Sequence, residues 1–170
     1  PANEIAGLKD PNCCRFPLAT SAKASYLDGQ RRFGAARSKG KRKHAACDLY
    51  HRNQEPVLAV APGKIIRSRY YFYQGTFAVE VQHSGGFIVR YGELSDKQSA
   101  KTKDKINIAE GDEIGFIKKV NSNCCEPMLH FELYSGKGKG PLSIKASRGF
   151  QRRSDLLNPS KYLQAWEGRK

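Results

Sequence analysis

Histidine is the residue in this chain of 170 residues that most directly suggests chemistry, and there are only four. One of them, His130, lies in the apolar segment PMLHFELY, with Met128 two positions before it and Glu132 two positions after it. Because alternate side chains of a strand share a face, these three would point one way and their apolar neighbours the other. His130 is therefore either a buried histidine satisfied by a neighbour or a metal ligand.

A metal at His130 would need further ligands from elsewhere in the chain. Zinc in hydrolytic sites usually takes three protein ligands, drawn from histidine and carboxylates, with water in the fourth position. The segment HAACD offers His44 and Asp48. In an extended strand these two residues would lie about 13 Å apart, too far to share one ion. The segment must therefore curl if both are ligands.

The elements that must position these residues are predicted to be short strands. Residues 76–83 alternate apolar and polar, SGG turns the chain, and residues 87–94 run back, which predicts an antiparallel hairpin. Further strands are expected within residues 56–68, 106–120 and 128–134. A short helix is expected near the end, with Asn158 as its cap and Pro159 at its first position. The predicted fold class is mostly β and antiparallel, with few short helices.

Two polar regions flank these strands. Residues 1–32 have few periodic apolar positions, which predicts an irregular N-terminal arm packed on a domain of residues 33–170. The stretch RSKGKRKH, residues 37–44, crowds basic side chains together. It carries no interleaved aromatic residues for stacking on bases, so we expect a solvated loop and no specific nucleic-acid binding.

The balance of charge and apolar residues limits the classes of partner. Lys and Arg outnumber Asp and Glu by 30 to 16, for a net charge of +14, which favours an anionic partner such as nucleic acid, acidic lipid or bacterial cell wall. No stretch approaches the roughly 20 consecutive apolar residues of a membrane span. The first residues also lack the basic and then apolar pattern of a secretory signal. We therefore expect no membrane span and no signal peptide of its own.

The five cysteines leave two alternatives open. They fall as two vicinal pairs and one single residue: Cys13 and Cys14, Cys47, and Cys124 and Cys125. The two pairs could be cross-linked to each other by disulfides, if the N-terminal arm lies beside the strand that carries His130, or they could remain free buried thiols, and spacing does not decide between these states. Adjacent cysteines lack the two-residue spacer of a zinc-binding CxxC motif. On an extended segment, Cys47 would point away from a metal held by Asp48.

The order of the motifs resembles a known family of enzymes. The chain contains, in sequence, FG, HAACDLY, PVLAVAPGKII, FAVEVQHSGGFIVRYGEL, EGDEIGFI, MLHFELY and NPSKYL. From Phe33 to about Leu163 this order resembles the LytM or lysostaphin-like zinc peptidoglycan endopeptidases. The resemblance implies a compact antiparallel β-sheet domain of that type. It also implies a Zn²⁺ ion held by His44, Asp48 and His130.

The chain departs from the family pattern at both non-ligand histidines. Met128 stands where the His-x-His motif of the family begins, and Glu93 stands where its Tyr-x-His-Leu motif has histidine. A carboxylate beside zinc can act as a general base, so Glu93 is the predicted catalytic residue. Tyr73 or Tyr91 could donate a hydrogen bond to the developing oxyanion, although both could equally pack in the hairpin.

The other polar candidates have simpler interpretations. His83, at the end of a predicted strand, is interpreted as structural. His51 follows Asp48 by three residues and is expected to face solvent rather than to support a ligand. Glu132 is expected on the outer face or beside a metal ligand.

Together these observations predict a zinc-dependent endopeptidase that hydrolyses peptide bonds of bacterial peptidoglycan, in the stem peptide or the cross-link. It would be an antibacterial effector or a lytic enzyme, with an immunity or inhibitor protein as a further partner. Such a chain would be made in the bacterial cytoplasm and delivered to the periplasm or cell wall by a secretion system such as type VI, by phage lysis, or by fusion to a larger exported protein. The alternative is a catalytically degenerate LytM-like module that binds cell wall or regulates another hydrolase.

Overall fold

The computed structural model describes residues 6–169, so the first five residues of the predicted N-terminal arm lie outside it. Its strands are β1 Ala36–Arg37, β2 Arg42–Lys43, β3 Cys47–Tyr50, β4 Pro56–Leu58, β5 Gly63–Tyr73, β6 Thr76–His83, β7 Ile88–Leu94, β8 Asn107–Ile108, β9 Glu113–Phe116, β10 Met128–Tyr134 and β11 Leu156–Leu157. Its helices are α1 Ala6–Lys9 and α2 Ser160–Glu167, with 3₁₀ turns at Gly29–Arg31 and Ser38–Gly40. All named strand pairs are antiparallel, which confirms the predicted class.

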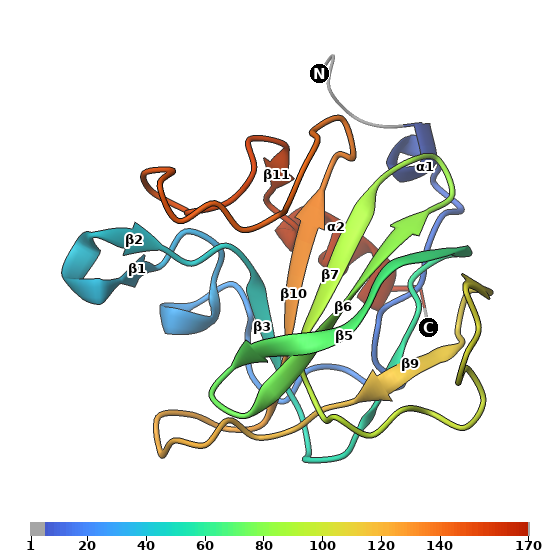
Figure 1. The fold of residues 1–170 in the computed structure, drawn as a ribbon, viewed down its shortest axis with the longest axis horizontal. Coiled ribbons are helices and arrows are strands. Elements are labelled where there is room, and N and C mark those ends of the chain that lie inside the picture. Colours follow the sequence, from blue (N-terminus) through green and yellow to red (C-terminus); the bar gives the residue numbers. More distant parts are fainter. Residues whose placement is uncertain (1–5, 170) are drawn as a thin grey trace.

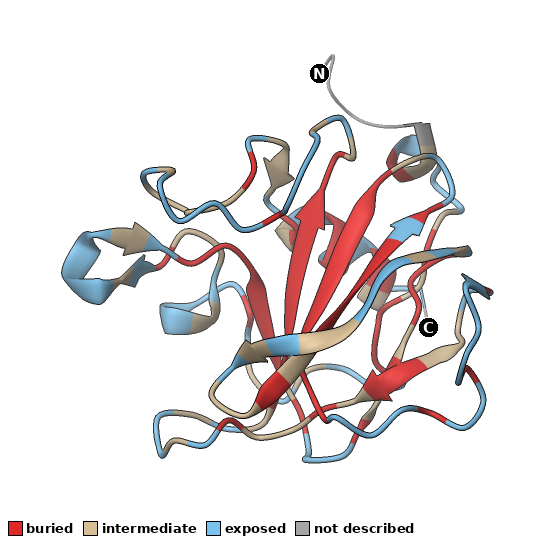
Figure 2. Cartoon of the chain, viewed as in Figure 1, coloured by how far each residue is buried: buried red, intermediate tan, exposed pale blue. Residues whose placement is uncertain are grey.

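The main sheet is built around β10. Six of its seven strands follow the order β11-β10-β7-β6-β5-β8, and the seventh, β3, pairs with β10 (Figure 1). One edge of β10 pairs with β7. The other edge pairs with β3 along residues 128–131 and with β11 at residues 133–134. Strand β10 is therefore enclosed on both edges, and Figure 2 shows it buried along its length together with β7.

The hairpin predicted over residues 76–94 is confirmed. Strands β6 and β7 pair from Phe77 opposite Leu94 to Gln82 opposite Ile88. The turn between them contains Gly85 and Gly86, whose φ angles are 91° and 101°. Only glycine adopts such values without steric cost, so these two residues allow the tight return of the chain.

The core lies between the sheet and α2, which runs behind β10 and β7 (Figure 1). Phe131 of β10 points to this side, with its ring 6.2 Å from the Trp166 ring of α2 and 5.8 Å from the Tyr91 ring of β7. The predicted helix is present, but it begins at Ser160 with Pro159 as its N-cap, one residue later than predicted. The Asn158 side chain, predicted as the cap, accepts a hydrogen bond from the Ser160 N–H at 3.0 Å.

Two regions differ from the expected loops. The basic stretch is not a loop but a short hairpin, in which Arg37 of β1 pairs with Arg42 of β2. The segment before it is irregular, yet it contributes Leu8, Phe16 and Tyr26 to the main hydrophobic cluster. A domain boundary at residue 32 stays a prediction. In the described part of the chain, no helix combines the length and apolarity of a membrane span.

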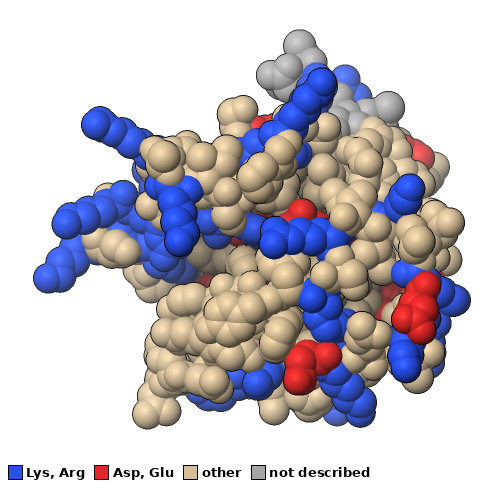
Figure 3. Space-filling view, viewed as in Figure 1, with Lys and Arg blue, Asp and Glu red and all other residues tan. Residues whose placement is uncertain are grey.

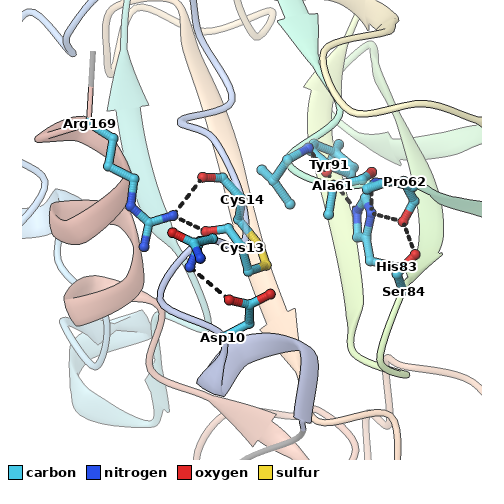
Figure 4. Close-up of a disulfide and its surroundings, with 11 residues drawn as sticks. Asp10, Cys13, Cys14, Ala61, Pro62, His83, Ser84, Tyr91 and Arg169 are labelled. Carbon is cyan, nitrogen blue, oxygen red and sulfur yellow. Dashed lines mark hydrogen bonds between the residues drawn. A yellow bond between two sulfur atoms is a disulfide. The ribbon is translucent and has the colours of Figure 1, made fainter.

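Disulfides join each vicinal cysteine pair, Cys13 with Cys14 and Cys124 with Cys125. Figure 4 shows the first pair, where Arg169 donates hydrogen bonds to the two cysteine carbonyls. Cys47 is a buried free thiol in the hydrophobic core, 3.5 Å from the Ser160 hydroxyl. The structure therefore matches neither alternative, because each pair closes on itself instead of cross-linking to the other pair or remaining as free thiols.

Candidate metal centre

The three predicted metal ligands meet at the junction of β3 and β10. The antiparallel register places Asp48 directly opposite His130. The chain bends at Ala46, just before β3, and this bend is the predicted curl. As a result, Nε2 of His44 lies 3.1 Å and Nδ1 of His130 lies 3.2 Å from the same oxygen, Oδ1 of Asp48. One ligand atom from each residue lies within 4.8 Å of the other two.

The two separations from Oδ1 of Asp48, 3.1 and 3.2 Å, are close to those of a tetrahedral zinc site. Ligand atoms about 2.0 to 2.1 Å from such an ion lie about 3.3 Å from one another. Two imidazole nitrogens and one carboxylate oxygen are also the donor set of many hydrolytic zinc sites. All three side chains are buried, which excludes most competing water. The residues present therefore fit the metal that the sequence predicts.

The other ring nitrogen of each histidine donates a hydrogen bond to a group that can only accept one. His44 donates from Nδ1 to the Arg32 carbonyl at 2.9 Å, and His130 donates from Nε2 to Glu132 at 2.9 Å. These bonds fix one proton on each ring and leave the nitrogens that face Asp48 available for a metal. Glu132 is thus not an outer-face group but a partner that orients His130.

Glu132 is the centre of a buried network of charges behind the ligands. Besides the bond from His130, its carboxylate accepts hydrogen bonds from Nε of Arg90 at 2.7 Å, from Nε of Arg152 at 2.9 Å and from the Tyr134 hydroxyl at 2.8 Å. Burial raises the pKa of Glu132, but the charge of Arg90 and the bond from His130 outweigh burial and hold the pKa well below its usual range. The carboxylate is therefore ionised beside His130.

We expect Glu132→Gln to destabilise the fold and to weaken zinc binding. The neutral amide leaves Arg90 and Arg152 without their buried counter-charge, a change that costs about 3 to 5 kcal/mol. It also loosens the His130 ring, which lowers zinc affinity by about 10- to 100-fold. Urea unfolding and competition with a zinc-binding dye measure the two effects.

Glu80→Gln is the matched control for this variant. Glu80 is also buried, and its carboxylate binds the Tyr70 hydroxyl and Arg67 instead of His130. We expect this variant to bind zinc with wild-type affinity. Wild-type zinc affinity in Glu132→Gln would show that Glu132 does not orient the ligand.

Glu93 lies beside the cluster in a strained backbone conformation. It is the next-to-last residue of β7, and its φ is 62°, in the left-handed region that costs a non-glycine residue about 1 to 3 kcal/mol. Its side chain is buried, and burial together with the charge of Asp48 raises the pKa of Glu93 to about 8. The charges of His130 and Arg37 act on it in the opposite direction. Such strain is retained where the surrounding structure or a function requires it.

One wall of the site comes from residues that the sequence did not single out. Gly92 pairs with His130 across the sheet, and the Phe72 ring of β5 lies 5.2 Å from the His130 ring. A Cβ atom at Gly92 would lie 2.9 Å from Phe72 and 3.3 Å from His130. Glycine at this position therefore allows the aromatic ring to close over the histidine.

The structure decides between the two alternatives for Tyr91 in favour of packing, and it shows that the expectation for His51 is wrong. Tyr91 does not reach the cluster, because its hydroxyl is buried in the core between His83 and the Val60 N–H, at 2.9 and 3.1 Å (Figure 4). His51 does not face solvent, because it is buried against the Thr20 hydroxyl at 2.7 Å. His83 donates from Nδ1 to the Ala61 carbonyl, and burial lowers its pKa to about 4, so it is a neutral structural histidine.

Comparisons with solved structures identify the fold. Lysostaphin, the antimicrobial peptidase from Staphylococcus simulans, aligns with 99% of this chain and 56% of its own, at 17% identity and a TM-score of 0.55. LytU aligns with 85% of this chain and 91% of its own, at 20% identity and a TM-score of 0.57. A zinc-containing peptidase from Vibrio cholerae aligns with 76% of this chain and 41% of its own, at 20% identity and a TM-score of 0.55.

The chain thus spans about half the length of lysostaphin and less than half of the Vibrio cholerae peptidase. A comparison with curated proteins found no match.

The fold is of the predicted lysostaphin type. The model of peptidase family M23 matches residues 42–141, which contain His44, Asp48, Glu93 and His130. More than half of the sequence carries this match, and the chain belongs to peptidase family M23.

Proposed function

We propose that this protein is a zinc-dependent endopeptidase that hydrolyses peptide bonds of bacterial peptidoglycan, in the stem peptide or in the cross-link. The observation that carries the proposal is the buried cluster of His44, Asp48 and His130 with the carboxyl of Glu93 beside it. Membership of family M23 and the fold shared with lysostaphin, an antimicrobial peptidase, support it.

His44, Asp48 and His130 would hold the zinc ion. A bound zinc ion polarises a peptide carbonyl and lowers the pKa of water toward about 7. Glu93 would take a proton from the attacking water as the water oxygen bonds to the carbonyl carbon. When the C–N bond breaks, Glu93 returns this proton to the amine that leaves.

The surface charge favours an anionic cell wall as the place of action. Lys and Arg side chains crowd over the β1–β2 hairpin, at the left of Figure 3, and this hairpin leads directly into His44. A positive surface of this kind raises the local concentration of the protein at an anionic polymer, with an effect that salt weakens.

Mass spectrometry of purified peptidoglycan tests the proposal. The sacculus would be incubated with zinc-loaded protein, with protein treated with a chelator, and with chelated protein to which zinc is restored. We expect new stem peptides or split cross-links in the first and third samples and none in the second. The mass of the products also identifies the bond that is cut.

The alternative, a degenerate module, is favoured by one observation. Met128 is buried on β10 where the resemblance expects histidine, and its thioether can neither take nor give a proton. Zinc-loaded protein that sediments with sacculi of both directly linked and bridged types, but leaves them uncut, would establish this alternative.

A further inference from the structure

Arg37 of β1 lies at the edge of the metal cluster, on the side opposite the two histidines. Its Nη2 is 3.7 Å from Oδ2 of Asp48, whereas both histidines face Oδ1. The Arg37 side chain is 22% exposed. The guanidinium therefore borders the buried cluster on one side and remains open to a ligand from solvent.

Gln30 holds this guanidinium in place. The side-chain oxygen of Gln30 accepts a hydrogen bond from Nη1 of Arg37 at 2.5 Å, and its main-chain carbonyl accepts one from Nη2 at 2.6 Å. Arginine has five N–H groups, so these bonds use two of them. The ion pair with Asp48 is longer than a hydrogen bond. Within residues 6–169, the other three N–H groups form no hydrogen bond.

The groups around Arg37 belong to the proposed reaction centre. Burial and the charge of Arg42 lower the pKa of Arg37, while the charges of Asp48, Glu93 and Tyr73 act in the opposite direction. An arginine side chain remains protonated at neutral pH. The site thus has a fixed positive charge 3.7 Å from the carboxylate of a proposed metal ligand, Asp48.

Amide hydrolysis needs such a charge, because the carbonyl oxygen becomes negative as water adds to the carbon. The resemblance expects two histidines at this site, but the chain has Glu93, assigned to proton transfer, and Met128, which cannot donate a hydrogen bond. We propose that Arg37 is a catalytic residue that donates a hydrogen bond to the oxygen of the scissile carbonyl in the transition state. This inference rests on the proposed peptidase function.

Kinetics of Arg37→Ala on soluble cross-linked muropeptides test this role. We expect kcat to fall by about 10²- to 10³-fold with KM little changed, because the bond forms only in the transition state. Zinc content should match the wild type. Arg37→Lys should recover part of the rate, since it keeps the charge without the planar fork. Added guanidinium ion should also raise the rate of the alanine variant and not that of the wild type.

Arg52→Ala is the matched control, because Arg52 carries the same charge but is exposed and pairs with Glu55, away from the metal cluster. We expect it to keep wild-type kcat. A readout independent of turnover is the affinity for a phosphinic analogue of the cleaved bond, measured by calorimetry. Arg37→Ala should weaken this affinity by about 10²-fold or more, and Arg52→Ala should leave it unchanged.

The outcomes separate this inference from the proposed function. If the wild type cleaves muropeptides and Arg37→Ala cleaves them equally fast, Arg37 has no catalytic role but the peptidase function stands. If Arg37→Ala loses zinc in parallel with activity, Arg37 only positions Asp48. If the zinc-loaded wild type leaves every substrate uncut, the proposed function and this inference both fail.

Discussion

His130→Ala is expected to lower the zinc content of the protein from about one ion per chain to none, and to abolish peptidoglycan hydrolysis with it. The substitution removes one of three ligand atoms and leaves only His44 and Asp48. It also removes the imidazole N–H that donates a hydrogen bond to Glu132 at 2.9 Å, so the contact that orients the ligand is lost together with the ligand. Elemental analysis by mass spectrometry after dialysis gives the zinc content, and the peptidoglycan digest gives the activity.

His51→Ala is the matched control, because His51 is equally buried and lies on the same segment as Asp48 but bonds to Thr20. It should keep its zinc. His44→Ala provides a second test in case the loss of His130 disturbs the buried Glu132 network, since the other nitrogen of His44 bonds only to the Arg32 carbonyl. A full zinc complement in both ligand variants would show that the metal binds elsewhere.

The part of the site that could be predicted from the sequence depends on local periodicity. Alternation along residues 128–134 places His130 and Glu132 on one face and Phe131 on the other, and the structure places them so. In the same way, the glycines after His83 are local turn residues and predict the turn of the β6–β7 hairpin. The strand period and the turn residues act over a few positions, so both can be recognised in a single sequence.

The part that could not be predicted depends on contacts between distant segments. Glu132 binds Arg90 and Arg152, and nothing in their spacing indicates that β7 and the segment before β11 enclose one carboxylate. His51 is buried because Thr20, thirty-one residues earlier, packs over it. The sequence did not distinguish Arg37 from its basic neighbours, which do face solvent. Its role follows from the β1–β2 hairpin, which turns this one arginine toward Asp48.

The family resemblance, rather than periodicity, indicated which residues are the predicted metal ligands. An extended HAACD segment would separate His44 from Asp48, and the bend at Ala46 that joins them has no marked turn residue. Glu93 presents the same difficulty, because its left-handed backbone lies within a strand pattern that predicts ordinary extended geometry. Both features are departures from local preference at the site itself, where such departures are concentrated in proteins.

Glu93→Gln is expected to lower kcat by about 10²- to 10⁴-fold while the zinc content stays at the wild-type level. Glutamine has the size of glutamate but cannot take a proton from water, and Glu93 is not among the three ligands. The pattern is thus the reverse of His130→Ala, which loses metal and activity together. Glu126→Gln, an exposed glutamate just before β10, is the matched control and should keep wild-type kcat.

Glu93→Gly separates the catalytic role of Glu93 from its strained backbone. Glycine adopts a φ of 62° without steric cost, so this variant should gain about 1 kcal/mol of unfolding free energy in urea while its activity falls as far as that of Glu93→Gln. A more stable, inactive protein with full zinc content would mean that the strain is retained to hold the carboxyl beside the metal. Cleavage by Glu93→Gln at the wild-type rate would instead assign proton transfer to another group.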